Sequence, residues 1–128
     1  MAALRAAQLG ARVALVEKAR VGGTCLNIGC IPTKALIASA EFYRDARTKS
    51  AALGVDIAKV AANWARMRQH KQEIVDQLVR GVEQLLSAQK VTLVRGEGHF
   101  FSPRRLQVVS ANETREIEAP RMTEVIFR

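Results

Sequence analysis

The 128-residue sequence lacks the residues and runs that mark metal sites, membrane spans and nucleic-acid platforms. It has two cysteines and two histidines, and His70 and His99 match no spacing of zinc ligands. No stretch approaches the roughly 18 consecutive apolar residues of a membrane-spanning helix. Aromatic residues make up 5%, and none alternates with basic residues as a base-stacking platform requires. We therefore expect no metal, no membrane span and no nucleic-acid partner.

Acidic residues are also scarce, because 12 Asp and Glu stand against 20 Lys and Arg, for a net charge of +8. An excess of this size can indicate an anionic partner. The basic residues are spread along the chain, however, which favours a solvated basic face or a surface that meets other domains. A non-catalytic basic binding module stays open as an alternative function.

The N-terminal stretch has the pattern of half a βαβ unit. Residues 2–9 favour a helix, and Gly10 suits its C-terminal cap. The apolar run 13–16, ending at Glu17, predicts a buried strand of a parallel sheet. The fold class is therefore α/β, and the first strand and glycine-rich turn of the unit are not in these 128 residues.

The remainder divides into helical and strand-like stretches. Residues 33–48 and 57–89 have helical patterns, although Gly81 weakens the second. Strand signals follow in "KVTLVRG", "GEGHFF", "LQVVS" and "REIEA", with a last weak strand in "RMTEVIF". We expect one partial domain, 1–128, made of a helix-strand-redox-motif segment (1–48), a helical excursion (57–89) and a small β-meander (90–128).

Both cysteines lie in "GGTCLNIGCIPTKAL", residues 22–36. Two buried structural cysteines would be one explanation of this pair. The neighbours favour a reactive dithiol: Gly22 and Gly23 let backbone amides approach a phosphate, and a helix start downstream would stabilise a thiolate. Lys34, one helical turn after Cys30, would add positive charge.

This segment resembles the active-site motif of the class I flavin disulfide reductases, GGTC-x4-C-x-P-[ST]-K, and within them most closely dihydrolipoamide dehydrogenase. Residues 2–18 and 78–103 resemble the same family's first FAD-domain helix, second strand and β-meander region. The resemblance implies a partial FAD-binding, Rossmann-like (doubly wound) domain. It covers nearly all of residues 2–120.

The resemblance implies a role for each thiol. Cys25 is similar to the interchange thiol, which exchanges with the disulfide substrate. Cys30 is similar to the thiol beside the flavin, which forms a charge-transfer contact and passes electrons. An accessible attacker and a separate electron-passing thiol suit the two halves of such a reaction.

The resemblance also implies FAD contacts. Glu17 corresponds to the acid that hydrogen-bonds the adenosine ribose, and Lys34 to the lysine near the reactive end of the flavin. Gly98 corresponds to a glycine on the adenine side, although a plain turn glycine is nearly as good an explanation. The flavin-nucleotide contact falls on the remaining four positions: Gly22, Gly23, Thr24 and Cys25.

The sequence departs from the family in what it does not contain. It has no GxGxxG loop for the FAD pyrophosphate, no ATG loop, no NAD domain and no His-Glu acid-base pair. We therefore expect an N-terminal fragment of the FAD domain, doubtful in FAD binding and inactive alone.

The full-length enzyme would be a cytoplasmic homodimer that passes electrons from dihydrolipoyl groups of 2-oxoacid dehydrogenase complexes through the cysteine pair and FAD to NAD. A mercuric-reductase-like fragment is the alternative within the same class.

Overall fold

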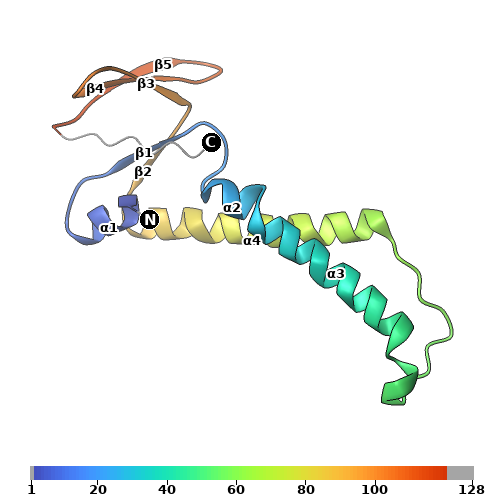
Figure 1. Cartoon of the computed structure of the whole chain (residues 1–128). Coiled ribbons are helices and arrows are strands. Elements are labelled where there is room, and N and C mark those ends of the chain that lie inside the picture. Colours follow the sequence, from blue (N-terminus) through green and yellow to red (C-terminus); the bar gives the residue numbers. More distant parts are fainter. Residues whose placement is uncertain (1, 121–128) are drawn as a thin grey trace. The chain divides into compact units, whose positions relative to one another are not determined.

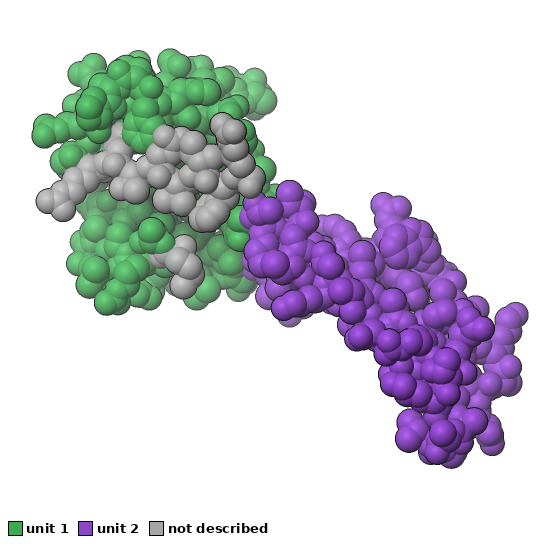
Figure 2. All heavy atoms as spheres, in the orientation of Figure 1, with its two compact units in different colours: residues 1–23, 79–128 green, residues 24–78 purple. Residues whose placement is uncertain are grey.

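The computed structural model describes residues 2–120, so the weak strand expected in "RMTEVIF" lies outside the described residues. The chain divides into two compact units (Figure 2). One unit combines residues 1–23 with 79–128, and the other comprises residues 24–78. The strand-bearing unit is therefore built from two separate stretches of sequence, and we call the other the thiol unit.

The strand-bearing unit contains a parallel pair of strands, β1 and β2 (Figure 1). β1 (Ala14–Glu17) pairs in register with β2 (Thr92–Arg95). The Thr92 amide donates to the Val13 carbonyl at 2.9 Å, and the Gly96 amide to the Glu17 carbonyl at 3.1 Å, which extends the ladder at both ends. The expected parallel strand over 13–17 is confirmed. The "KVTLVRG" strand also forms, but its partner is β1, whereas the local pattern suggested the meander.

Three further strands form the antiparallel meander, in the order β3-β4-β5. Gly96, with φ +149°, makes the corner between β2 and β3. At the β4–β5 turn the Ser110 amide donates to the Glu113 carbonyl at 2.9 Å. The strands are β3 (Glu97–Ser102), β4 (Arg105–Val109) and β5 (Thr114–Glu118).

The core of the strand-bearing unit is small and rich in valine. α1 (Ala2–Gln8) ends as expected, with Gly10 at φ +88°. β1 is only half-buried, although its sequence predicted a strand covered on both faces. The buried side chains of this unit are Val21, Val79, Leu86, Val91 and Val108.

The thiol unit is helical. A 3-10 turn, η1 (Ala51–Leu53), and an irregular stretch separate its two long helices, α3 (Cys30–Thr48) and α4 (Trp64–Ala88); α4 continues into the other unit. α4 begins at Trp64 and not at the expected Ile57, because Asn63 caps it: the Asn63 side-chain oxygen accepts the Arg66 amide at 3.0 Å. Val75 is the fully buried side chain of this unit, 1% exposed.

Candidate functional site

The two thiols lie next to one another at the junction of two helices. Cys25 is in the short helix α2 (Gly23–Asn27), and Cys30 is the first residue of α3. Both are exposed free cysteines, and their side chains hydrogen-bond to each other. The structure therefore brings together the two residues that the motif predicted to react as a pair.

The sulfur of Cys25 lies at the start of α3. It accepts hydrogen bonds from the Cys30 side chain and from the backbone amides of Cys30 and Ile31. Together with the charge of Lys34, these bonds hold the pKa of Cys25 below its ordinary value, the bond from the Cys30 thiol contributing most. The geometry therefore favours Cys25 as the thiolate of the pair.

Cys30 has the opposite electrostatics. Its pKa is raised, first because its thiol donates to the Cys25 side chain and then because the Cys25 charge opposes a second negative charge beside it. Lys34 acts on both sulfurs, in the direction of the thiolate. The two shifts belong to one interacting pair, and both favour negative charge on Cys25 over Cys30.

Gly29 forms the junction between α2 and α3, and the sequence reading did not single it out. A Cβ on Gly29 would stand 3.0 Å from the Cys25 Cα and 3.0 Å from the Thr24 carbonyl oxygen. The Gly29 carbonyl accepts bonds from Thr33, from the amide at 3.2 Å and from the hydroxyl at 2.8 Å. A glycine directly before the second cysteine was the available signal.

Glu17 ends β1 in the strand-bearing unit. Its carboxylate accepts a hydrogen bond of 2.9 Å from the Ala19 amide. The Arg95 side chain donates a hydrogen bond of 2.7 Å to the Ala19 carbonyl. Arg95 also pairs with Glu83 of α4, so the loop after β1 is held on both sides. Ligands of α/β sheets bind beyond the carboxyl ends of parallel strands, which is where this half-buried carboxylate lies. Glu17 therefore fits the ribose contact of a dinucleotide.

The glycine pair after β1 has a backbone conformation that favours glycine. Gly22 has φ +106° and Gly23 has φ +73°, values that residues other than glycine rarely adopt. A Cβ on Gly23 would meet nothing within 4 Å, so conformation rather than crowding requires glycine there. Thr24, the next residue, is exposed. An open backbone turn of this kind fits the approach of a nucleotide.

Gly98 has a packing explanation of its own. It pairs with Val108 across β3 and β4. A Cβ there would stand 3.3 Å from the Leu106 side chain and 3.5 Å from that of Val16. The contact of Gly98 with the adenine side of FAD remains a prediction.

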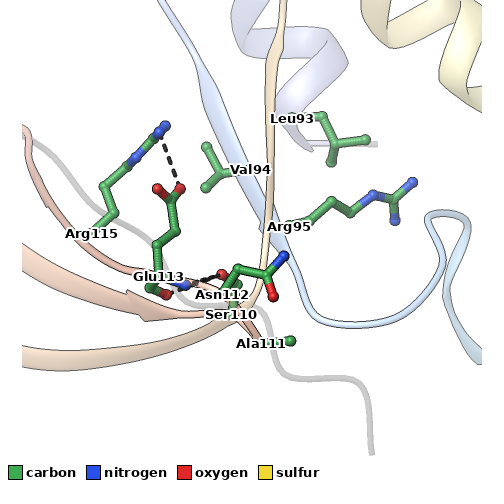
Figure 3. A pocket seen from close by; sticks show the side chains of 8 residues that line it. All are labelled: Leu93, Val94, Arg95, Ser110, Ala111, Asn112, Glu113 and Arg115. Carbon is green, nitrogen blue, oxygen red and sulfur yellow. Dashed lines mark hydrogen bonds and ion pairs between the residues drawn. The ribbon is translucent and has the colours of Figure 1, made fainter.

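An open hollow of about 580 Å³ lies between β2 and the β4–β5 turn (Figure 3). Glu113 and Arg115 form an ion pair of 3.2 Å at its edge. The predicted site residues do not line it, so this hollow is not part of the predicted site. Its lining residues are Leu93, Val94, Arg95, Ser110, Ala111, Asn112, Glu113 and Arg115.

Metal-ligating side chains do not gather anywhere in the described part of the chain, where no three His, Cys, Asp or Glu residues form a metal-binding group. None of the helices within residues 2–120 has both the length and the apolar character that a bilayer crossing needs.

Residues 1–122 match the model of a protein family described as pyridine nucleotide-disulphide oxidoreductase. The chain belongs to this family. It is one of FAD-dependent oxidoreductases, which confirms the class that the cysteine motif indicated. The α/β chain, with its long helices and small sheets, is accordingly a partial FAD-binding, Rossmann-like fold of the disulfide reductases.

Named relatives narrow the resemblance. The chain is 48% identical over 103 residues to a dihydrolipoyl dehydrogenase of Bacillus subtilis, covering 80% of this chain and 22% of the relative. It is 44% identical over 109 residues to the mitochondrial dihydrolipoyl dehydrogenase of Pisum sativum, covering 84% of this chain and 22% of the relative. The chain thus spans about a quarter or less of the length of these relatives.

A solved structure shows the same fold. The Cu(II) complex of the HOCl-induced flavoprotein disulfide reductase RclA from Escherichia coli superposes with a TM-score of 0.72 at 29% identity. The match covers 91% of this chain and 23% of that protein. Within this pyridine nucleotide-disulphide oxidoreductase chain, the thiol unit holds Thr24, Cys25, Cys30 and Lys34, and the strand-bearing unit holds Glu17, Gly22, Gly23 and Gly98.

Proposed function

We propose that this chain carries the dithiol/disulfide centre of an FAD-dependent oxidoreductase of the dihydrolipoamide dehydrogenase type. The observation that supports it is the Cys25–Cys30 pair. The Cys25 sulfur accepts hydrogen bonds from backbone amides at the start of α3 and from the Cys30 thiol. The dihydrolipoyl dehydrogenases among the relatives favour this substrate class over the mercuric alternative.

The centre begins the reaction as a Cys25–Cys30 disulfide. A thiolate of the dihydrolipoyl group attacks the Cys25 sulfur, the protein disulfide breaks, and Cys30 leaves with the electron pair. The second dihydrolipoyl thiol gives its proton to the Cys30 thiolate and attacks the substrate sulfur, which releases Cys25 as a thiolate and the lipoyl group as a cyclic disulfide. A low thiol pKa makes a good leaving group, so the bonds that stabilise the Cys25 thiolate assist this second step.

FAD would be held by Glu17 at its ribose and by the glycine turn with Thr24 at the nucleotide, with Lys34 near the flavin. When bound, FAD supplies a two-electron acceptor that passes the electrons from the reduced dithiol to NAD. The residues of this chain hold the two reduced thiols next to each other and lower the pKa of Cys25.

The activity of the whole protein extends this proposal. We propose NAD-dependent oxidation of the dihydrolipoyl groups of 2-oxoacid dehydrogenase complexes by a cytoplasmic homodimer. The 128 residues by themselves contain no GxGxxG loop, whose backbone amides bind a dinucleotide pyrophosphate. We expect the isolated chain to exchange disulfides but to show no NADH–lipoamide activity.

The test separates the two thiols by substitution. Reduced chain is treated with 2-hydroxyethyl disulfide and analysed by mass spectrometry. The unsubstituted chain should lose two hydrogens and carry no adduct, because Cys30 resolves the mixed disulfide on Cys25. Cys30→Ser should trap the adduct on Cys25. Cys25→Ser should react more slowly, since Cys25 accepts hydrogen bonds from the amides of both Cys30 and Ile31, whereas Cys30 has only that of its own amide.

Two results would contradict the proposal. If both thiols of the oxidised, unsubstituted chain still alkylate readily, they do not form a redox pair. If the two single variants trap the adduct at the same rate, Cys25 is not the exchanging thiol.

A further inference from the structure

We propose that Gly29 is a positioning residue for Cys25, because its lack of a Cβ lets the Cys25 backbone lie against the first turn of α3. This inference deepens the proposed function and rests on it for the role of Cys25 as the exchanging thiol. It names a third residue of the motif, one between the two cysteines, as necessary for the chemistry.

Backbone atoms of α2 leave no room for a side chain at Gly29. A Cβ on Gly29 would stand 3.0 Å from the Cys25 Cα and 3.0 Å from the Thr24 carbonyl oxygen, and 3.4 Å from the Thr24 carbonyl carbon. All three are backbone atoms, so no rotation of a side chain relieves the contact. A Cβ at this position therefore requires the backbone of Thr24 and Cys25 to shift by a few tenths of an ångström.

The backbone amides at the start of α3 donate to the Cys25 sulfur. The first turn of an α-helix has backbone N–H groups without partners in the helix. In α3 the amides of Cys30 and Ile31 donate to Cys25, and Pro32 has no N–H to offer. The Thr33 amide already bonds the Gly29 carbonyl. The donors available in the first turn of α3 thus converge on the Cys25 sulfur.

Gly29 has no side chain that could compete with the Cys25 sulfur for these amides. It is the N-cap of α3 and makes no side-chain cap hydrogen bond. A Ser, Asp or Asn at an N-cap would place its own oxygen against these amides and compete with the sulfur. Glycine at this position therefore leaves both the space and the donors to Cys25.

The experiment measures the pH dependence of iodoacetamide alkylation of Cys25 in the reduced chain, with tandem mass spectrometry to separate it from Cys30. Gly29→Ala is compared with the unsubstituted chain and with Gly81→Ala. Gly81 is the matched control because it lies in α4 and an added Cβ there meets nothing within 4 Å.

We expect Gly29→Ala to move the Cys25 profile to higher pH and to slow its alkylation at pH 7 about tenfold, the effect of one pKa unit. Gly81→Ala should leave the profile unchanged. Circular dichroism establishes that each variant keeps its helices. A folded Gly29→Ala chain with the unsubstituted profile overturns the positioning role and leaves the proposed function intact.

Two other outcomes are also decisive. If the unsubstituted chain itself alkylates Cys25 and Cys30 with the same ordinary profile, the proposed function fails together with the inference. If Gly29→Ala unfolds, it is measured again in the Gly81→Ala background, which favours the helix, with sucrose added. A chain that stays unfolded there contradicts the inference, because Gly29 is then required for folding and not for placing the thiol.

Discussion

The thiol unit and the strand-bearing unit hold their candidate residues by different means. Cys25 and Cys30 are exposed and positioned by backbone groups no more than six residues away, at the end of a helix with no buried residue. Glu17 lies in β1, whose partner β2 is far along the chain, and Gly98 lies in β3, which pairs with the next strand, β4. The reactive thiols therefore depend on local geometry, and the position of Glu17 depends on long-range strand pairing.

This difference explains which substitutions each region should tolerate. A change beside the thiols is felt through the reactivity of a sulfur atom, whereas a change in the strands, or at the buried Val75, is felt first through the stability of the fold. Three stability measurements can break or sharpen this comparison, in order of decreasing effect.

Gly96→Ala should have the largest effect. Gly96 has φ +149°, and a Cβ would stand 2.6 Å from the Val108 side chain and 2.8 Å from the Val109 carbonyl oxygen. Strain and the clash together should lower the free energy of unfolding by about 3 kcal/mol, measured by urea denaturation. Gly98→Ala is the control, since its nearest contact would be a movable side chain at 3.3 Å. Equal losses in the two variants would show that the β2–β3 corner is not the strained point.

Val75→Ala should come next, with a loss of about 2 kcal/mol in the free energy of unfolding, because two buried methyl groups leave a cavity. Val75 is 1% exposed, and Leu78 on the same helix is 41% exposed. Leu78→Ala is the control and should cost clearly less in the same urea titration. A larger loss for Leu78 would mean that the thiol unit is not organised around Val75.

Arg95→Met should have the smallest effect of the three. It removes the bonds to the Ala19 carbonyl and to Glu83, but both side chains of the ion pair are more than a third exposed. We expect a loss of about 1 kcal/mol, most of it from the bond to the carbonyl. Raising the salt concentration should therefore change the stability of the unsubstituted chain very little. A strong salt dependence would assign the effect to the Glu83 pair instead.

The sequence predicted the parts of the site that depend on neighbours along the chain. The motif around Cys25 and Cys30 and the strand ending at Glu17 both follow from local patterns. Gly29 was missed because its role is a close contact between two helices, which a sequence pattern does not display.

Two features of the fold were predicted wrongly from the sequence. The partner of β2 could not be chosen from sequence, because the run "KVTLVRG" is followed directly by other strands and its true partner is β1, far earlier in the chain. The start of α4 was misplaced because apolar residues continue the helical pattern upstream of Trp64. The Asn63 cap, a known helix-start signal, marks the true beginning.

The β1–β2 pair joins Ala14 to Thr92 and Glu17 to Arg95 across the whole helical excursion. The irregular stretch between η1 and α4 lies inside that excursion. A peptide bond cut there would leave each piece with one strand of the pair. The molecule is therefore a natural candidate for a split protein, whose halves are produced separately and reassemble through a shared sheet, with the cysteines on one half and the meander on the other.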